Sequence, residues 1–140
     1  MNPEIRLQAF VRAELARPFV WGDTNCVALA LRAVDAMHGT GLHVSHHRHM
    51  GSAARARVWT RKHGAYGVVT ELLKDGLFEI PTAYSQPGDI LIGETDDGQI
   101  AAHVCLGLRV LSSTEADGVI LRRRSDLSPA PMYCAAWRLT

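Results

Sequence analysis

The chain has 140 residues and a mass of 15.3 kDa, and 47% of its residues are apolar against 21% charged. This composition favours one packed domain over residues 1–140 and excludes global disorder. The formal net charge of +1 lacks the basic excess of a nucleic-acid-binding protein. No apolar run is long enough to span a membrane, and the first ten residues form no apolar signal segment, so we expect a chain that is made and first resides in the cytoplasm.

The first half of the chain has helical periodicity. Apolar residues recur at helical spacing over Pro3–Ala16, and Pro18 ends that helix. A second helix is predicted over Cys26–Met37, and it is apolar nearly all round, which is typical of a helix in the middle of a domain. His43–Gly51 reads as a histidine-rich connection. Two further helices are predicted, a polar one over Ser52–His63 and a short one over Tyr66–Lys74.

The second half of the chain changes to the period of strands. Strands are predicted over Asp89–Ile92, Ala102–Leu111, Val119–Arg123 and Tyr133–Leu139. The run Arg122–Arg124 is interpreted as part of a solvated edge strand. Helices followed by antiparallel strands indicate an α+β domain, in which N-terminal helices pack on one side of a small sheet.

Cys26 is the first candidate for chemistry. It follows Thr24 and Asn25, two residues that cap helices well, and so lies at a predicted helix N-terminus. Free amides and the helix dipole at that position stabilise a thiolate, so we expect a lowered thiol pKa and an oxyanion hole. The alternative is a small buried residue in an apolar helix.

His103 is the second candidate. Strand alternation predicts that His103, Cys105 and Gly107 share one face, with Val104 and Leu106 on the other. A histidine that faces the helix N-terminus can accept the thiol proton and later protonate the leaving amine. The alternative is a structural histidine.

Several motifs together resemble the NlpC-type cysteine peptidases, compact relatives of papain that cut peptidoglycan stem peptides. They are Phe19-Val20-Trp21-Gly22, Asn25-Cys26, Pro87-Gly88-Asp89-Ile90-Leu91-Ile92 and His103-Val104-Cys105-Leu106-Gly107. The ending Ala136-Trp137-Arg138 is similar to the ending of short phage and prophage proteins found among tail genes. The resemblance runs from about Pro18 to Arg138 and implies a papain-like NlpC-type fold.

The resemblance also implies roles for individual residues. Cys26 falls on the family nucleophile and His103 on its base. Trp21 and Gly22 fall on the turn that shapes the substrate cleft, next to Asn25.

Three positions depart from the family pattern. Asn25 stands where aspartate is usual, and it can still cap the helix. Cys105 stands where glycine is usual and narrows the cleft. No histidine follows as the third polar residue, and Ser112, with Ser113 and Thr114 beside it, is the candidate in its place. A hydroxyl orients an imidazole less firmly than a carboxylate does.

The resemblance therefore implies a thiol hydrolase that cleaves murein stem peptides without a cofactor, located in a phage tail after synthesis in the host cytoplasm. Peptidoglycan peptide and other tail-tip proteins are the implied partners, with no nucleic acid and no membrane. The alternative is a catalytically degenerate papain-like domain that acts as a structural tail-tip or tail-assembly protein. A cell-wall toxin or amidase outside any virion is a third possibility.

Metal and disulfide chemistry are not expected. The three cysteines form no CxxC pair, which disfavours a disulfide framework or a thiolate metal site. His43, His46, His47 and His49 lack the helical spacing with a carboxylate that a metal site needs, so a solvated loop is the interpretation.

Overall fold

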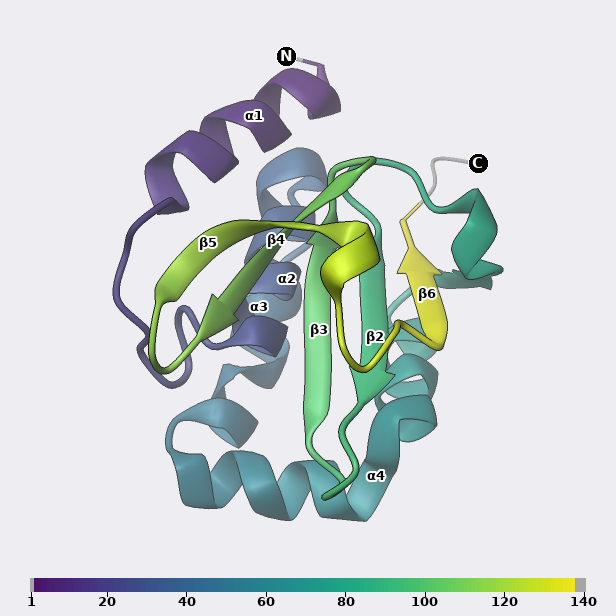
Figure 1. The fold of residues 1–140 in the computed structure, drawn as a ribbon. Helices are drawn as coiled ribbons and strands as arrows, with labels where there is room; N and C mark the ends of the chain where they lie inside the picture. The colour runs from purple at the N-terminus through teal and green to yellow at the C-terminus, as the bar shows by residue number, and fades with distance from the viewer. Residues whose placement is uncertain (1, 138–140) are drawn as a thin grey trace.

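The computed structural model describes residues 2–137, which form helices and one antiparallel sheet (Figure 1). The α-helices are α1 (Pro3–Glu14), α2 (Cys26–His38), α3 (Leu42–His46) and α4 (Ala53–Lys74). The strands are β1 (Phe78–Ile80), β2 (Ile90–Glu94), β3 (Ile100–Cys105), β4 (Arg109–Thr114), β5 (Gly118–Arg123) and β6 (Tyr133–Ala136). Short 3-10 turns cover η1 (His47–Met50), η2 (Thr82–Tyr84) and η3 (Arg124–Asp126).

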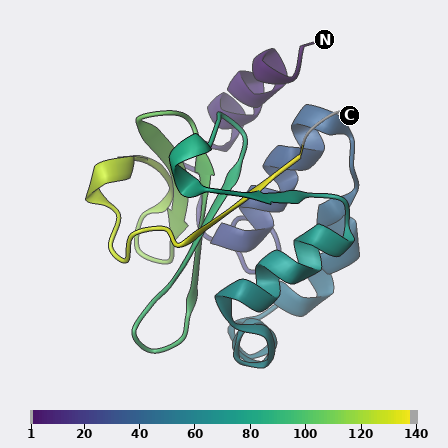
Figure 2. The same ribbon diagram turned by 90° about the vertical axis from the view of Figure 1, so that its right-hand side faces the viewer.

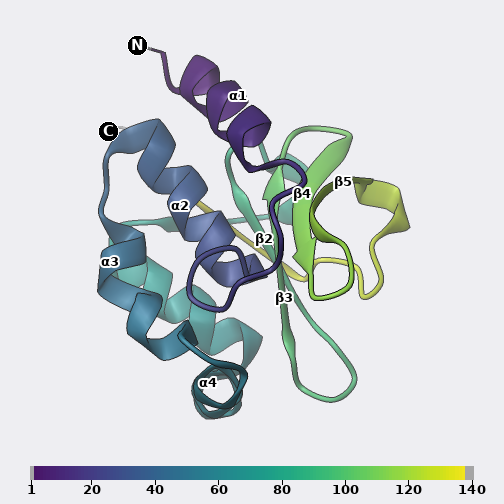
Figure 3. The same ribbon diagram turned by 90° about the vertical axis from the view of Figure 1, so that its left-hand side faces the viewer.

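The sheet has the strand order β1-β6-β2-β3-β4-β5, and every neighbouring pair is antiparallel. Helices α2 and α4 pack directly on one face of this sheet, while α1 and α3 pack on α2 (Figures 2 and 3). The expected α+β domain with helices on one side of a small antiparallel sheet is therefore confirmed. Strand β5 lies at the edge of the sheet, as the run of arginines at its end indicated.

Helix α2 is the centre of the domain. It is buried on almost every side, including Ala28, Leu29 and Val34, as its apolar sequence predicted. It ends at Gly39, which has the left-handed conformation (φ 67°) that favours glycine at a helix C-terminus. Because α2 packs against β3 and β4, its first residue lies over the sheet.

The two faces of the sheet carry separate apolar clusters. The helix face contributes alternate strand residues to the main core: Ile90, Ile92, Ile100, Ala102, Val104, Leu111, Val119 and Ala135. The outer face holds a smaller cluster: Leu91, Cys105, Val110, Leu127 and Cys134. In β2, β3, β4 and β6, neighbouring residues thus belong to opposite clusters, which assigns their side chains to the two faces of the sheet.

Some predicted boundaries are wrong. The segment His43–Gly51 is not an open loop, because α3 and η1 cover most of it. The predicted strand Ala102–Leu111 is two strands, β3 and β4, joined by a tight turn in which the Leu106 N–H donates to Arg109 O. Leu139, at the end of the last predicted strand, lies outside the described residues.

Helix α4 joins the two helices that the sequence separated. Its backbone kinks at Gly64 (φ 67°, ψ 178°), which lies between the two predicted segments. The short strand β1 escaped prediction because it has only three residues, two of them exposed. Within residues 2–137, none of the helices has the length and apolar content of a membrane span.

Candidate functional site

Cys26 begins α2, as predicted, and a tightly hydrogen-bonded turn positions it. The Thr24 hydroxyl accepts from the Val20 N–H and donates to Pro18 O, each at 2.6 Å. Gly22 has a φ of 82°, a left-handed conformation that a side chain would strain, so this position requires glycine. The turn is therefore rigid and holds the start of α2 in one place.

Ion pairs fasten the same turn to the helices around it. The buried Glu14 pairs with Arg17 at 2.8 Å and also with Arg32. Asp23, inside the turn, pairs with Arg17 at 2.6 Å and with Arg32 at 3.2 Å. This network ties α1, the turn and α2 into one unit.

Asn25 occupies the N-cap position of α2, as the sequence predicted, but its side chain does not cap the helix. Its Oδ1 instead accepts from the Gly22 N–H at 2.8 Å, so the side chain closes the turn and makes no capping hydrogen bond. The first amides of α2 are left for other acceptors. Two of them, those of Cys26 and Val27, lie where they lower the pKa of the Cys26 thiol.

The Cys26 sulfur packs against the backbone of β3. The thiol donates to Ile100 O at 3.6 Å, and the Ala102 amide also lies against the sulfur. Burial outweighs these amides and raises the pKa of the thiol. The expected lowered pKa is wrong, because desolvation is a larger effect here than the helix N-terminus. Cys26 is a neutral thiol at pH 7.

His103 lies in β3 and is buried, with 8% of its surface exposed. Its Nδ1 is 2.6 Å from the hydroxyl oxygen of Ser112 on β4. Burial, with a smaller contribution from the Arg122 guanidinium, lowers the pKa of His103 to about 4. His103 is therefore neutral at pH 7, and the predicted partnership of His103 with Ser112 is present.

The structure does not bring Cys26 and His103 together as a dyad. Cys26 packs against the main core on the helix face, next to Ile100 and Ala102. His103 alternates with those residues and lies opposite Leu91 of β2, a member of the outer cluster. The imidazole therefore projects to the outer face of the sheet, away from α2.

Cys105 also lies on the outer face. It is fully buried in the outer cluster, and its sulfur is 3.7 Å from the Ser85 hydroxyl. It shares the face of His103, as the alternation predicted, but it lines no surface beside Cys26. The expectation that Cys105 narrows a substrate cleft is therefore wrong. None of Cys26, Cys105 and Cys134, which all lie within the described residues, forms a disulfide.

An open cavity of about 200 Å³ adjoins Cys26. We call it the Cys26 cavity, and its walls include Trp21, Cys26, Trp59, Gln99, Ser113 and Glu115. Trp21 and Asn25 thus line the same space as Cys26, and Gly22 lies in the turn beside them.

The sequence interpretation did not assign Ser113 to this cavity. Its side chain is 8% exposed, and within residues 2–137 its hydroxyl oxygen has no hydrogen-bond partner. Ser113 follows Ser112 by one residue and therefore projects to the opposite face, toward Cys26. Leu111 faces the helices, and Ser113, two residues further along β4, therefore lies on the same face.

No cluster of three or more histidine, cysteine or acidic side chains suited to a metal ion occurs in the part of the chain that the structure describes. The Cys26 cavity is lined by a neutral thiol, the first amides of a helix, hydroxyl and amide groups, and the carboxylate of Glu115. These groups can donate and accept hydrogen bonds, and among the described residues the hydrogen bond of the thiol itself goes to the Ile100 carbonyl.

The fold and the site define an α+β domain whose central helix begins with a partly buried cysteine above an antiparallel sheet. The chain belongs to the DUF6950 family, a domain of unknown function, whose family model matches residues 2–138. A comparison with curated proteins found no match.

Proposed function

We propose that this chain is a catalytically inactive papain-like domain that serves as a structural or assembly component of a phage tail. The observation that carries the proposal is the separation of the two candidate groups. The thiol of Cys26 contacts β3 on the helix face, whereas the His103 imidazole projects from the outer face to Ser112.

Thiol catalysis requires a base within hydrogen-bonding reach of the sulfur. The Cys26 thiol donates to a backbone carbonyl, which cannot take up its proton. His103 is occupied by Ser112, and its low pKa makes it a weak base. Both groups stay neutral at pH 7, so they do not form the thiolate–imidazolium pair that a cysteine peptidase uses.

The size of the Cys26 cavity supports binding of a small group. At about 200 Å³ it is smaller than the roughly 300–1,000 Å³ of ordinary small-molecule sites. A single side chain of a partner fits such a volume better than a branched stem peptide does. The free hydroxyl of Ser113 supplies one hydrogen bond to such a group.

The phage-tail setting is supported by the sequence resemblance. The turn with Trp21 and Gly22, the Pro87-Gly88-Asp89 turn before β2, and the ending Ala136-Trp137-Arg138 follow the pattern of short tail-associated proteins. A helix that begins with cysteine and packs on an antiparallel sheet is also compatible with a papain-like origin.

A murein peptidase is the second candidate, and one observation favours it. The amides of Cys26 and Val27 lie close enough to the sulfur to lower its pKa, which favours a thiolate nucleophile. In this alternative a base other than His103 must approach Cys26 when substrate or a tail partner binds.

Muropeptide release separates the two candidates. The purified chain and its Cys26→Ala variant are each incubated with murein sacculi, and soluble peptides are measured by mass spectrometry. We expect no release from either protein. Release by the native chain that disappears in Cys26→Ala would establish the peptidase and refute the structural proposal.

A second measurement tests the structural role directly. Phage particles are assembled without the chain, with the native chain and with Cys26→Ala. We expect few complete tails without the chain and normal numbers with either form of it. Normal tails in the absence of the chain would contradict the proposal.

A further inference from the structure

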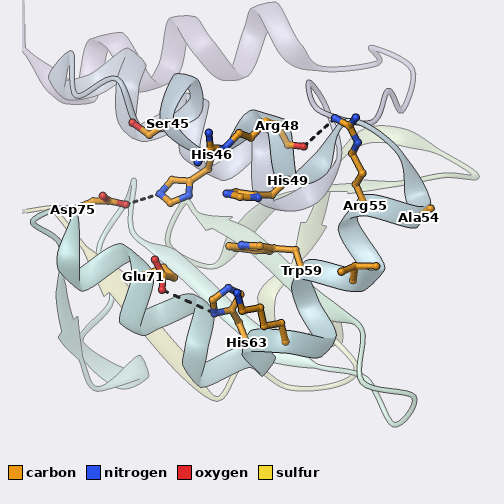
Figure 4. Close-up of a pocket in the computed structure, with 12 residues that line it drawn as sticks. Ser45, His46, Arg48, His49, Ala54, Arg55, Trp59, His63, Glu71 and Asp75 are labelled. Atoms are coloured by element: carbon orange, nitrogen blue, oxygen red, sulfur yellow. Dashed lines mark hydrogen bonds and ion pairs between the residues drawn. The ribbon is translucent and has the colours of Figure 1, made fainter.

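A second and larger cavity is lined by residues of α3, η1 and α4. It measures about 940 Å³ and opens between η1 and α4 (Figure 4). We call it the α4 groove, and the residues that matter here are Arg48, His49, Arg55, Trp59, Lys62 and His63. Its volume is that of a site for a small organic molecule.

Stacked rings form the floor of the α4 groove. The His49 and Trp59 rings lie nearly parallel, 12° apart, with centroids separated by 5.7 Å. His63 packs against the other side of Trp59 at 5.2 Å (Figure 4). Trp59 itself is buried, so this column fixes the shape of the floor.

Three basic side chains, which we call the basic wall, line the groove. Arg48 lies in η1, whereas Arg55 and Lys62 are seven residues apart and therefore on one face of α4. Arg55 donates to Arg48 O at 3.5 Å, which joins the two elements. Among residues 2–137, none of these three cations forms an ion pair with a carboxylate.

The acidic groups of the groove lie at its other end and already have partners. Asp75 is 2.6 Å from His46, and Glu71 is 3.2 Å from Lys74 and 3.9 Å from His63 (Figure 4). The carboxylates are thus matched within the fold, while the wall of Arg48, Arg55 and Lys62 is not. The uncompensated charge of the groove is positive.

Basic groups also gather around His49. Burial lowers the pKa of His49, and the charges of Arg48, His46 and His63 lower it further, with Glu71 opposing them. A bound anion would reduce this repulsion. Guanidinium groups match phosphate oxygens in geometry, and lysine adds a point charge.

An apolar surface lies beside the basic wall. Val58 lines the groove with 69% of its surface exposed, and Ala54 is one helical turn before it. A ligand that combines a phosphate group with a flat ring would cover this surface and reach the cations at the same time.

We propose that the α4 groove binds an organic phosphate of nucleotide size, with its phosphate on Arg48, Arg55 and Lys62 and its ring against Val58. This site is separate from the Cys26 cavity and holds whether or not the chain cleaves murein. Trp59 lines both cavities.

Calorimetric titration of the intact chain tests this proposal. ADP is the probe, with adenosine and inorganic phosphate as partial probes. We expect ADP to bind more tightly than either part. Adenosine binding as tightly as ADP would refute the phosphate contact, and inorganic phosphate binding as tightly would refute the ring contact.

Two variants form a matched pair for the location of the site. Lys62→Gln removes a cation of the groove, whereas Arg61→Gln removes an exposed cation of the same helix that lies outside it. We expect about tenfold weaker ADP binding in Lys62→Gln and about twofold or less change in Arg61→Gln. Equal effects of the two variants, or no ADP binding by the native chain at millimolar concentration, would overturn the proposal.

Discussion

The two faces of the sheet differ in size and in the polar groups that they hold. The helix face carries the main core, and at its edge the Cys26 thiol and the Ser113 hydroxyl border a cavity. The outer face has a smaller cluster, and on this face His103 and Ser112 form a hydrogen bond with each other. Neighbouring residues of one strand, such as Ser112 and Ser113, therefore have different partners, because strand alternation places their side chains on opposite faces of the sheet.

Truncation of a core side chain should give the largest difference in free energy of unfolding between the two faces. We expect Leu29→Ala, in the middle of α2, to lower the free energy of unfolding by about 4 kcal/mol, because it leaves a void in the main core. Leu127→Ala should cost about 2 kcal/mol, because its cluster is smaller and its site can collapse more easily. Urea unfolding measures both values, and equal losses would contradict the unequal weight of the two faces.

Acid should act on the outer face through His103. Its pKa of about 4 in the folded chain lies below the usual 6.5, so the unfolded chain binds the proton more readily. Stability from this group is complete above pH 6.5 and is lost as the pH falls toward 4, by roughly 3 kcal/mol in all.

The variant His103→Gln isolates that effect. Its free energy of unfolding, measured by urea titration at several pH values, should decline less steeply than that of the native chain between pH 6.5 and 4. Parallel declines of the two proteins would show that His103 is not a buried neutral group.

Removal of the Ser112 hydroxyl should affect stability less than the core truncations and the titration of His103 do. Ser112→Ala breaks the hydrogen bond to His103 and should lower the free energy of unfolding by about 1 kcal/mol. Ser113→Ala is the matched control on the other face, and it should change stability little, because that hydroxyl has no partner among the described residues. A larger loss in Ser113→Ala than in Ser112→Ala would contradict the contrast between the two hydroxyls.

The sequence predicted the α+β class and placed Cys26 at a helix start because both depend on local pattern. It also predicted that His103 and Cys105 share a face of their strand. It did not identify which face the helices cover. Val104 and Leu111 lie on the helix face. Packing between distant segments decides this, and a local sequence pattern carries no information about such packing.

The direction of the pKa shift of Cys26 could not be predicted from the sequence either. A helix N-terminus lowers a thiol pKa, but burial against Ile100 and Ala102 raises it more, and only the folded chain shows that contact. Asn25 was expected to cap α2, yet the turn geometry directs its side chain to the Gly22 amide.

The alkylation rate of Cys26 as a function of pH tests the central claim most directly. Iodoacetamide labelling with peptide mapping resolves the three cysteines in the native chain and in His103→Gln. We expect Cys26 to react slowly at pH 7, to accelerate only above the usual thiol pKa of about 8.5, and to give the same profile in both proteins. Rapid labelling at pH 7 that is lost in His103→Gln would show that the imidazole activates the sulfur, and the account of an inactive domain would be wrong.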